Sequence, residues 1–154
     1  LHTLDATETL TRIISAFPPY QQKSIRIQIA GLLKAVISQR LMKSSKGNSR
    51  VPAVEVLVST PLIRDCILQE EKTSQIRDAI ASGTSQYGMQ TFDQSLFYLY
   101  QSELITLDEA LRGSTNPDEF RLRLAGIQNT TAQAKEKMEQ FSGIGKVGDL
   151  IERE

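Results

Sequence analysis

The sequence has little of the chemistry that most catalytic or metal sites require. Among its 154 residues there is one cysteine, Cys66, and one histidine, His2. A single cysteine excludes an internal disulfide and a cysteine metal cluster, and it fits an intracellular setting. Cys66 falls with Leu62, Ile63 and Ile67 on the apolar face of a predicted helix, so we interpret it as a small buried hydrophobe and not as a nucleophile.

An excess of charge of one sign is also missing, because 18 basic residues balance 18 acidic ones. This balance argues against a protein that binds nucleic acid through bulk charge. No apolar run approaches the roughly 20 residues that a membrane-spanning helix requires, and the polar N-terminus has no secretory signal. At this length the chain can form one domain with a core. A start at Leu-His-Thr, without Met, leads us to expect a longer parent chain.

The sequence has no complete phosphate-binding loop. Such a loop needs G-x-x-x-x-G-K-[ST], but before Gly145-Lys146 the first glycine is replaced by Gln140, and Val147 follows the lysine. We find neither a metal-ligand cluster nor a G-x-S-x-G elbow. A catalytic Ser-His or Cys-His arrangement would have to use His2, and no spacing identifies an acid to orient it. We therefore expect that this chain alone does not hold a complete active site.

The N-terminal stretch carries a clear helix signal. Asp5 followed by Glu8 has the form of an N-cap with its reciprocal partner, apolar residues follow at helical spacing, and Pro18-Pro19 ends the pattern. His2 thus precedes a helix N-terminus, where backbone N–H groups and the helix dipole favour anions. His2 could face a phosphate or a carboxylate. On the local sequence alone, a hydrogen bond to a neighbouring loop is the stronger interpretation.

A second helix over residues 20–34 and a β-hairpin are predicted next. Arg26 lies off the apolar stripe of that helix, so we interpret it as a solvated residue. Residues 36–42 and 51–58 are rich in β-branched and aliphatic side chains, and a polar run separates them. The run is basic, and we interpret it as a solvated hairpin tip; contact with an acidic partner or phosphate is the alternative.

The rest of the sequence is read as short helices, with a Gly/Ser/Thr-rich break over residues 82–90. Thr73 is expected to cap a helix that Gly83 ends, and Thr106 with Glu109 is expected to form a capping box. Residues from Gln128 onward are interpreted as a polar helical or flexible tail. Helix starts are further predicted at Thr60-Pro61, Thr91 and Asn116-Pro117.

Several stretches, in order over roughly residues 1–125, together resemble the type II/IV secretion ATPases and within them the PilT branch. They are LHTLDA at residues 1–6 with Arg12; FPP at 17–19; Gln22, Arg26 and Gln28; VISQRL at 36–41 after Leu33; VPAVEV at 51–56; TPLIR at 60–64; GMQTFDQSL at 88–96; LIT at 104–106; and NPDEFRL at 116–122.

The resemblance implies an α/β fold: the C-terminal half of a RecA-like ATPase domain, made of helices and a β-hairpin, followed by a mostly helical region. We expect that half at residues 1–83, an appended helical subdomain at 84–125, and the tail at 126–154. The Walker A loop, the Walker B motif and a PAS-like domain would lie upstream. The segment alone would then be inactive.

The implied function is a homo-hexameric, ATP-hydrolysing motor that retracts type IV pili in twitching motility. It would act in the cytoplasm, at the inner membrane face, on a membrane platform protein, with no nucleic acid and no membrane span of its own. ATP and Mg²⁺ would be bound mainly outside this segment. LHTLDA matches the family's histidine box, so the resemblance assigns γ-phosphate sensing to His2. Arg12 would form a sensor or inter-subunit ion pair, or else a surface salt bridge.

One motif departs from the family pattern. The retraction-associated helix resembles Ala-Ile-Arg-Asn-Leu-Ile-Arg-Glu, and Ile63 and Arg64 match it, but Leu68 and Gln69 replace the second Arg and the Glu. This leaves room for an accessory paralogue. An assembly ATPase of the PilB or GspE kind is an alternative, although those carry a four-cysteine zinc motif where this chain has a hairpin. A non-enzymatic interaction module of the motor is the other alternative.

Overall fold

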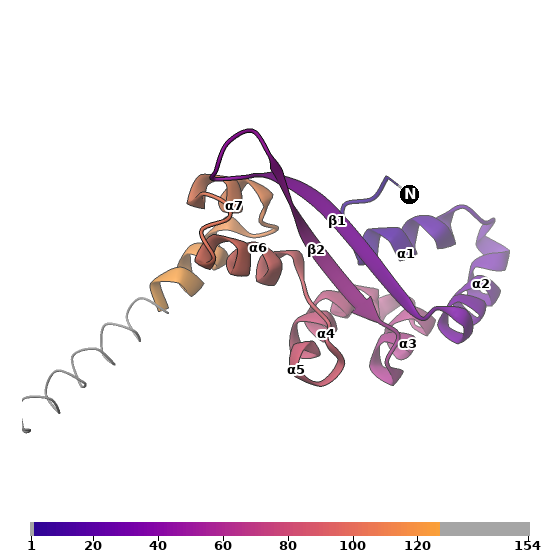
Figure 1. Cartoon of the computed structure of the whole chain (residues 1–154). Helices are drawn as coiled ribbons and strands as arrows, with labels where there is room; N and C mark the ends of the chain where they lie inside the picture. Colours follow the sequence, from indigo (N-terminus) through magenta and orange to yellow (C-terminus); the bar gives the residue numbers. More distant parts are fainter. Residues whose placement is uncertain (1, 127–154) are drawn as a thin grey trace, which may run out of the picture. The chain divides into compact units, whose positions relative to one another are not determined.

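The computed structural model describes residues 2–126 (Figure 1). The chain divides into two compact units, Leu1–Thr115 and Asn116–Glu154. In the second unit, residues 117–126 are helical. The elements of the first unit are α1 (Ala6–Ser15), α2 (Pro19–Leu32), β1 (Ala35–Lys43), β2 (Arg50–Val58), α3 (Pro61–Leu68), the 3₁₀ helix η1 (Glu70–Gln75), α4 (Ile76–Ser82), α5 (Thr84–Tyr87), α6 (Phe92–Gln101) and α7 (Leu107–Gly113).

Short-range hydrogen bonds set most helix starts. Thr60, Thr91 and Thr106 each accept, through the side-chain oxygen, the N–H of the residue three positions on. Such a cap satisfies a helix N–H that has no partner in the helix, and each is worth about 1 kcal/mol. The predicted starts at these residues are confirmed, and so is the start at Asn116, which accepts the N–H of Glu119 in the second unit.

β1 and β2 form the predicted antiparallel hairpin, paired from Ala35 with Val58 to Lys43 with Arg50. Alternate side chains point to opposite faces of a strand. On β2 the buried face carries Ala53, Glu55 and Leu57. Figure 1 shows α6 and α7 beside the hairpin; α6 contacts β2 and α7 contacts β1. The expected α/β class, helices with one hairpin followed by a helical region, is confirmed.

The main core gathers the apolar faces of α1, α2, α3 and α4 around one side chain of β2 and Met89. These side chains leave water together, and that burial is the main favourable contribution to folding. Cys66 is fully buried among them, as predicted. The core consists of Ala6, Leu10, Ala30, Leu57, Ile63, Cys66, Ile67, Ile76, Ala79, Ile80 and Met89.

Arg26 was expected to be solvated, and this is wrong. Its side chain is buried, and its guanidinium donates to the carbonyl of Ile67 at 3.0 Å and to the hydroxyl of Thr73 at 3.3 Å. The prediction that Thr73 caps the next helix is also wrong. Thr73 lies within η1, and Gln75, the residue before α4, makes no capping bond. Gly83 does end α4, as predicted.

Three finer expectations also change. The break over 82–90 contains the short helix α5. Glu109 does not complete a capping box, because its carboxylate accepts the backbone N–H of Lys43 at 2.8 Å and pairs with Arg112. Leu62, placed on the apolar face of its helix, is 54% exposed. The domain boundaries after residues 83 and 125 stay predictions. The predicted tail at residues 126–154 lies outside the described residues from residue 127 on.

Candidate functional site

The site is built on the segment before α1. Asp5 caps the helix, because its Oδ1 accepts the N–H of Glu8 at 2.7 Å. The carboxylate of Glu8 reaches back to the N–H of Leu4 at 2.6 Å. The reciprocal bond therefore forms, but one residue upstream of the predicted cap position. Both bonds hold residues 4 and 5 against the first turn of the helix.

His2 and Arg12 meet in this segment. The Nη1 of Arg12 donates to the backbone carbonyl of His2 at 2.7 Å. The Nη2 of Arg12 also lies 3.4 Å from Oε1 of Glu8, in an exposed ion pair. The side chain of His2 is exposed. The arrangement thus fixes the backbone of the histidine and leaves its imidazole directed to solvent, where it is accessible to a ligand.

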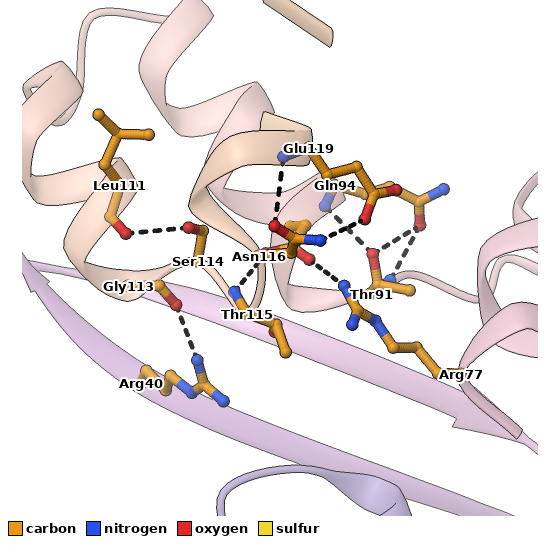
Figure 2. Close-up of polar contacts among 11 residues, drawn as sticks. Arg40, Arg77, Thr91, Gln94, Leu111, Gly113, Ser114, Thr115, Asn116 and Glu119 are labelled. Carbon is orange, nitrogen blue, oxygen red and sulfur yellow. Dashed lines mark hydrogen bonds and ion pairs between the residues drawn. The ribbon is translucent and has the colours of Figure 1, made fainter. Parts of the chain in front are cut away.

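Arg40 holds the same segment from the hairpin. Its Nη2 donates to the carbonyl of Leu4 at 2.7 Å. Its Nη1 donates to the carbonyl of Gly113 at 2.8 Å, the bond drawn in Figure 2. Its guanidinium carbon lies 3.9 Å from the centroid of the Phe92 ring, a cation–π contact. One side chain of β1 therefore joins the start of the chain to α6 and to the end of α7.

Glu55 on β2 holds the next residue. Its side chain is 5% exposed, and its Oε1 accepts the N–H of Ala6 at 2.8 Å. Burial is the largest influence on the pKa of Glu55 and raises it from the ordinary value of 4.5; the Ala6 N–H opposes this, and the neighbouring Asp5 carboxylate adds to it. By accepting this bond, the Glu55 carboxylate satisfies one of the N–H groups at the start of α1 that have no partner within the helix.

Sequence reasoning missed Arg40 and Glu55 as parts of the site. The signal was present in the two-residue period of the strands. Glu55 alternates with Ala53 and Leu57 on the buried face of β2, and Arg40 lies opposite Ala53 in the register. A charged residue on a buried strand face needs a partner. That partner, the backbone of residues 4 and 6, cannot be identified from the pattern.

A second polar network ties α4 to α6. The carboxylate of Asp93 receives a bond from Arg77 at 2.5 Å and from the N–H of Thr115 at 2.8 Å (Figure 2). Asp93 on α6 thereby binds both α4 and the segment after α7. These contacts serve the packing of the first unit and bring no candidate site residue with them.

The two residues of the retraction-associated motif separate on α3. Ile63 is fully buried in the core, and Arg64 is exposed, with its Nε 3.4 Å from the hydroxyl of Ser59. A partner that approaches this helix would therefore meet Arg64, together with the exposed Leu62 and Leu68. The fully buried Cys66 lies on the inner side, where burial raises its thiol pKa.

The described residues offer donors for an anion and little for a metal. Residues 2–126 contain no cluster of three or more His, Cys, Asp or Glu side chains able to hold a metal ion. Within the same part of the chain, no helix combines the length and apolar character needed to cross a membrane. An imidazole and a guanidinium can both donate hydrogen bonds to phosphate oxygens. The arrangement at the N-terminus is suited to contact with an anion held mostly by other residues.

Comparison with known proteins identifies relatives. No family model matches. A twitching motility protein of Neisseria gonorrhoeae is 38% identical over 118 residues, which is 77% of this chain and 31% of that protein. The type IV pilus retraction ATPase PilT of Pseudomonas aeruginosa is 37% identical over 120 residues. The type IV pilus ATPase PilU of the same organism is 35% identical over 124 residues. These two matches cover 78% and 80% of this chain, and 34% and 32% of PilT and PilU.

Solved structures agree. The crystal structure of the pilus retraction motor PilT with bound ADP matches 77% of this chain and 32% of its own, at 38% identity and a TM-score of 0.66. The ATPase DotB of Legionella pneumophila, at 23% identity and a TM-score of 0.57, supports the fold alone. The chain spans about a third of the length of these relatives. Over about three quarters of its length, this chain is therefore similar to part of the PilT-type pilus ATPases.

Proposed function

We propose that this chain is part of an ATP-hydrolysing motor that powers retraction of type IV pili. The observation that carries this is the 38% identity over 118 residues to a twitching motility protein. The homologous retraction motor was crystallised with bound ADP. Because the match spans about a third of each relative, the activity belongs to the whole polypeptide. The segment alone lacks Walker A and Walker B and is inactive under this proposal.

In this proposal His2 contacts the γ-phosphate of ATP. Its imidazole is exposed, and an imidazole can donate a hydrogen bond to a phosphate oxygen, which suits a group that responds to phosphate. Arg12 has two roles in this proposal. It binds the backbone carbonyl of His2, and it places a positive charge beside that carbonyl. The described residues supply no acidic cluster for Mg²⁺. ATP would supply the γ-phosphoryl group. Both ATP and Mg²⁺ would be bound mainly by residues outside this segment.

The motor would be a homo-hexamer at the cytoplasmic face of the inner membrane, working on the pilus platform protein. Arg64, exposed on α3, is the residue we propose for contact with a partner. Ile63 contributes to that contact only by setting the position of the helix, since its side chain is buried. The retained Ile63 and Arg64 favour a retraction role. Leu68 and Gln69, which replace the Arg and the Glu of the family motif, are the positions at which an accessory paralogue would differ from a retraction motor.

The test is ATP turnover by the longest natural polypeptide that contains this chain. His2→Ala should lower turnover about 100-fold, because a hydrogen-bond donor at a developing phosphate charge is worth that much. Thr11→Ala is the matched control, since Thr11 is exposed on α1 and its hydroxyl donates to the carbonyl of Thr7. Turnover unchanged in His2→Ala would sink the assignment of His2.

A second experiment separates an enzyme from a non-enzymatic module. Calorimetric titration of residues 1–154 with ATP should give no appreciable binding, because the phosphate-binding loop lies elsewhere in the polypeptide. Tight, stoichiometric binding would show that the nucleotide site lies within this chain. A parent polypeptide without Walker A and Walker B motifs would make the chain an interaction module.

A further inference from the structure

Two charged side chains of the hairpin grip the stretch that connects His2 to α1. Arg40 of β1 donates to the carbonyl of Leu4 at 2.7 Å, and Glu55 of β2 accepts the N–H of Ala6 at 2.8 Å. We call Arg40 and Glu55 the strand clamp. The two bonds address opposite polar groups of the backbone, a carbonyl and an N–H, two residues apart. Together they define both the position and the direction of this stretch.

The strand clamp connects distant parts of the chain, whereas the bond made by Arg12 is local. Arg12 lies on α1, so its bond to the His2 carbonyl ties the segment only to its own helix. Arg40 lies 36 residues from Leu4 and 73 residues from Gly113 along the chain. It therefore places the segment relative to the hairpin and to the helices that pack on it. A residue that contacts a reacting phosphate must keep a fixed position relative to the rest of the domain.

Arginine is the side chain that this position requires. The guanidinium offers several N–H donors in a fixed fork, and its flat face stacks on an aromatic ring. Arg40 uses both properties, since two of its nitrogens serve the carbonyls of Leu4 and Gly113 while its carbon lies 3.9 Å from the Phe92 ring centroid. A lysine has one nitrogen and no flat face, so it cannot make all three contacts in this geometry.

We propose that the strand clamp, Arg40 with Glu55, positions the His2 segment for phosphate contact and couples that segment to α6 and α7. This inference rests on the proposed function, because it takes His2 as the residue that is positioned. Neither clamp residue needs to touch the nucleotide. Their contribution is to hold the backbone of residues 4 to 6, and with it the stretch that carries His2, in one position relative to the hairpin.

The first test is Arg40→Lys in the longest natural polypeptide that contains the chain. Amide hydrogen exchange of residues 3–6, followed by mass spectrometry, should become about tenfold faster, the effect of losing one charge-assisted hydrogen bond. ATP turnover, kcat, should fall while KM for ATP stays unchanged, because binding depends mainly on other residues. Arg121→Lys is the matched control, an exposed arginine paired with Asp118 in its own helix.

A second pair of variants covers the case in which Arg40→Lys does not fold. Glu55→Gln keeps an oxygen that can accept the Ala6 N–H, whereas Glu55→Ala removes it. Exchange at Ala6 should accelerate in Glu55→Ala and return toward the wild-type rate in Glu55→Gln, with kcat following the same order. Equal exchange rates and equal kcat in the two variants would overturn the positioning role of Glu55.

The outcomes separate the two proposals. Faster exchange at residues 3–6 with a lower kcat supports both. Faster exchange with an unchanged kcat upholds the grip on the segment but refutes phosphate contact by His2. Unchanged exchange in Arg40→Lys overturns the clamp, whatever the effect on turnover. An exchange increase spread evenly over α1, α6 and the hairpin would mean that Arg40 supports only the fold, and this also overturns the clamp.

Discussion

The guanidinium of Arg12 donates to the backbone carbonyl of His2 at 2.7 Å, across ten residues of sequence. The bond brings together His2, to which the family resemblance assigns γ-phosphate sensing, and Arg12, to which it assigns a sensor or inter-subunit ion pair. The bond involves the backbone carbonyl of His2, so it occupies neither the imidazole nor the remaining N–H groups of the guanidinium.

Replacing Arg12 should reduce activity more than stability. Arg12→Gln removes an exposed ion pair with Glu8, which contributes about 0–1 kcal/mol. It also frees the His2 carbonyl, so turnover of ATP by the longest natural polypeptide should fall about tenfold, as expected for one lost charge-assisted bond. Lys23→Gln, an exposed residue of α2, is the control. Equal turnover in both variants would remove Arg12 from the site.

Ile63 and Leu62 are neighbours on α3 with opposite environments. Ile63 is fully buried and Leu62 is 54% exposed. Ile63→Ala should lower the free energy of unfolding by about 2–5 kcal/mol, because it leaves a cavity in the core. Leu62→Ala should change it by less than about 0.5 kcal/mol. Urea denaturation measures both, and a small loss in Ile63→Ala would mean that the core tolerates the cavity.

As pH rises, the free energy of unfolding of the wild-type protein should fall relative to that of the Glu55→Gln variant. The pKa of Glu55 is raised by burial, so the folded state binds a proton more tightly than the unfolded state does. The stability from that proton is present below the ordinary pKa of 4.5 and is lost as pH rises through the raised value. Urea midpoints of the two proteins should diverge in favour of Glu55→Gln from about pH 4 upward. Parallel pH profiles would contradict this.

Glu109 should show the opposite pH dependence. The backbone N–H of Lys43 is the largest influence that lowers the pKa of Glu109, with burial opposing it and Arg112 adding to it. The stability from this carboxylate is present above the ordinary pKa of 4.5 and is lost as pH falls through the lowered value. Wild type should therefore exceed Glu109→Gln in stability at neutral pH. The difference should vanish in acid, as measured by thermal unfolding; a difference that grows in acid would refute this.

The helices illustrate what is predictable from sequence. Asp5, Thr60, Thr91 and Thr106 each accept the N–H of the residue three positions on, so cap and partner lie within one turn. The strands were predictable for a similar reason, because their two-residue period and polar loop are local patterns. Thr73 shows the limit: its residue type fits a cap, but its hydroxyl accepts a bond from Arg26, 47 residues away.

For the candidate site, the sequence by itself determined that His2 stands before a capped helix and that Arg12 follows on that helix. It also determined the family resemblance, because ordered motifs need no coordinates. Only the tertiary structure decided that Arg40 and Glu55 hold the segment, that Arg26 is buried, and that Ile63 is a core residue while Arg64 is exposed. The physical reason is range: a cap is satisfied within four residues, whereas a buried charge takes whatever partner the packed chain brings to it.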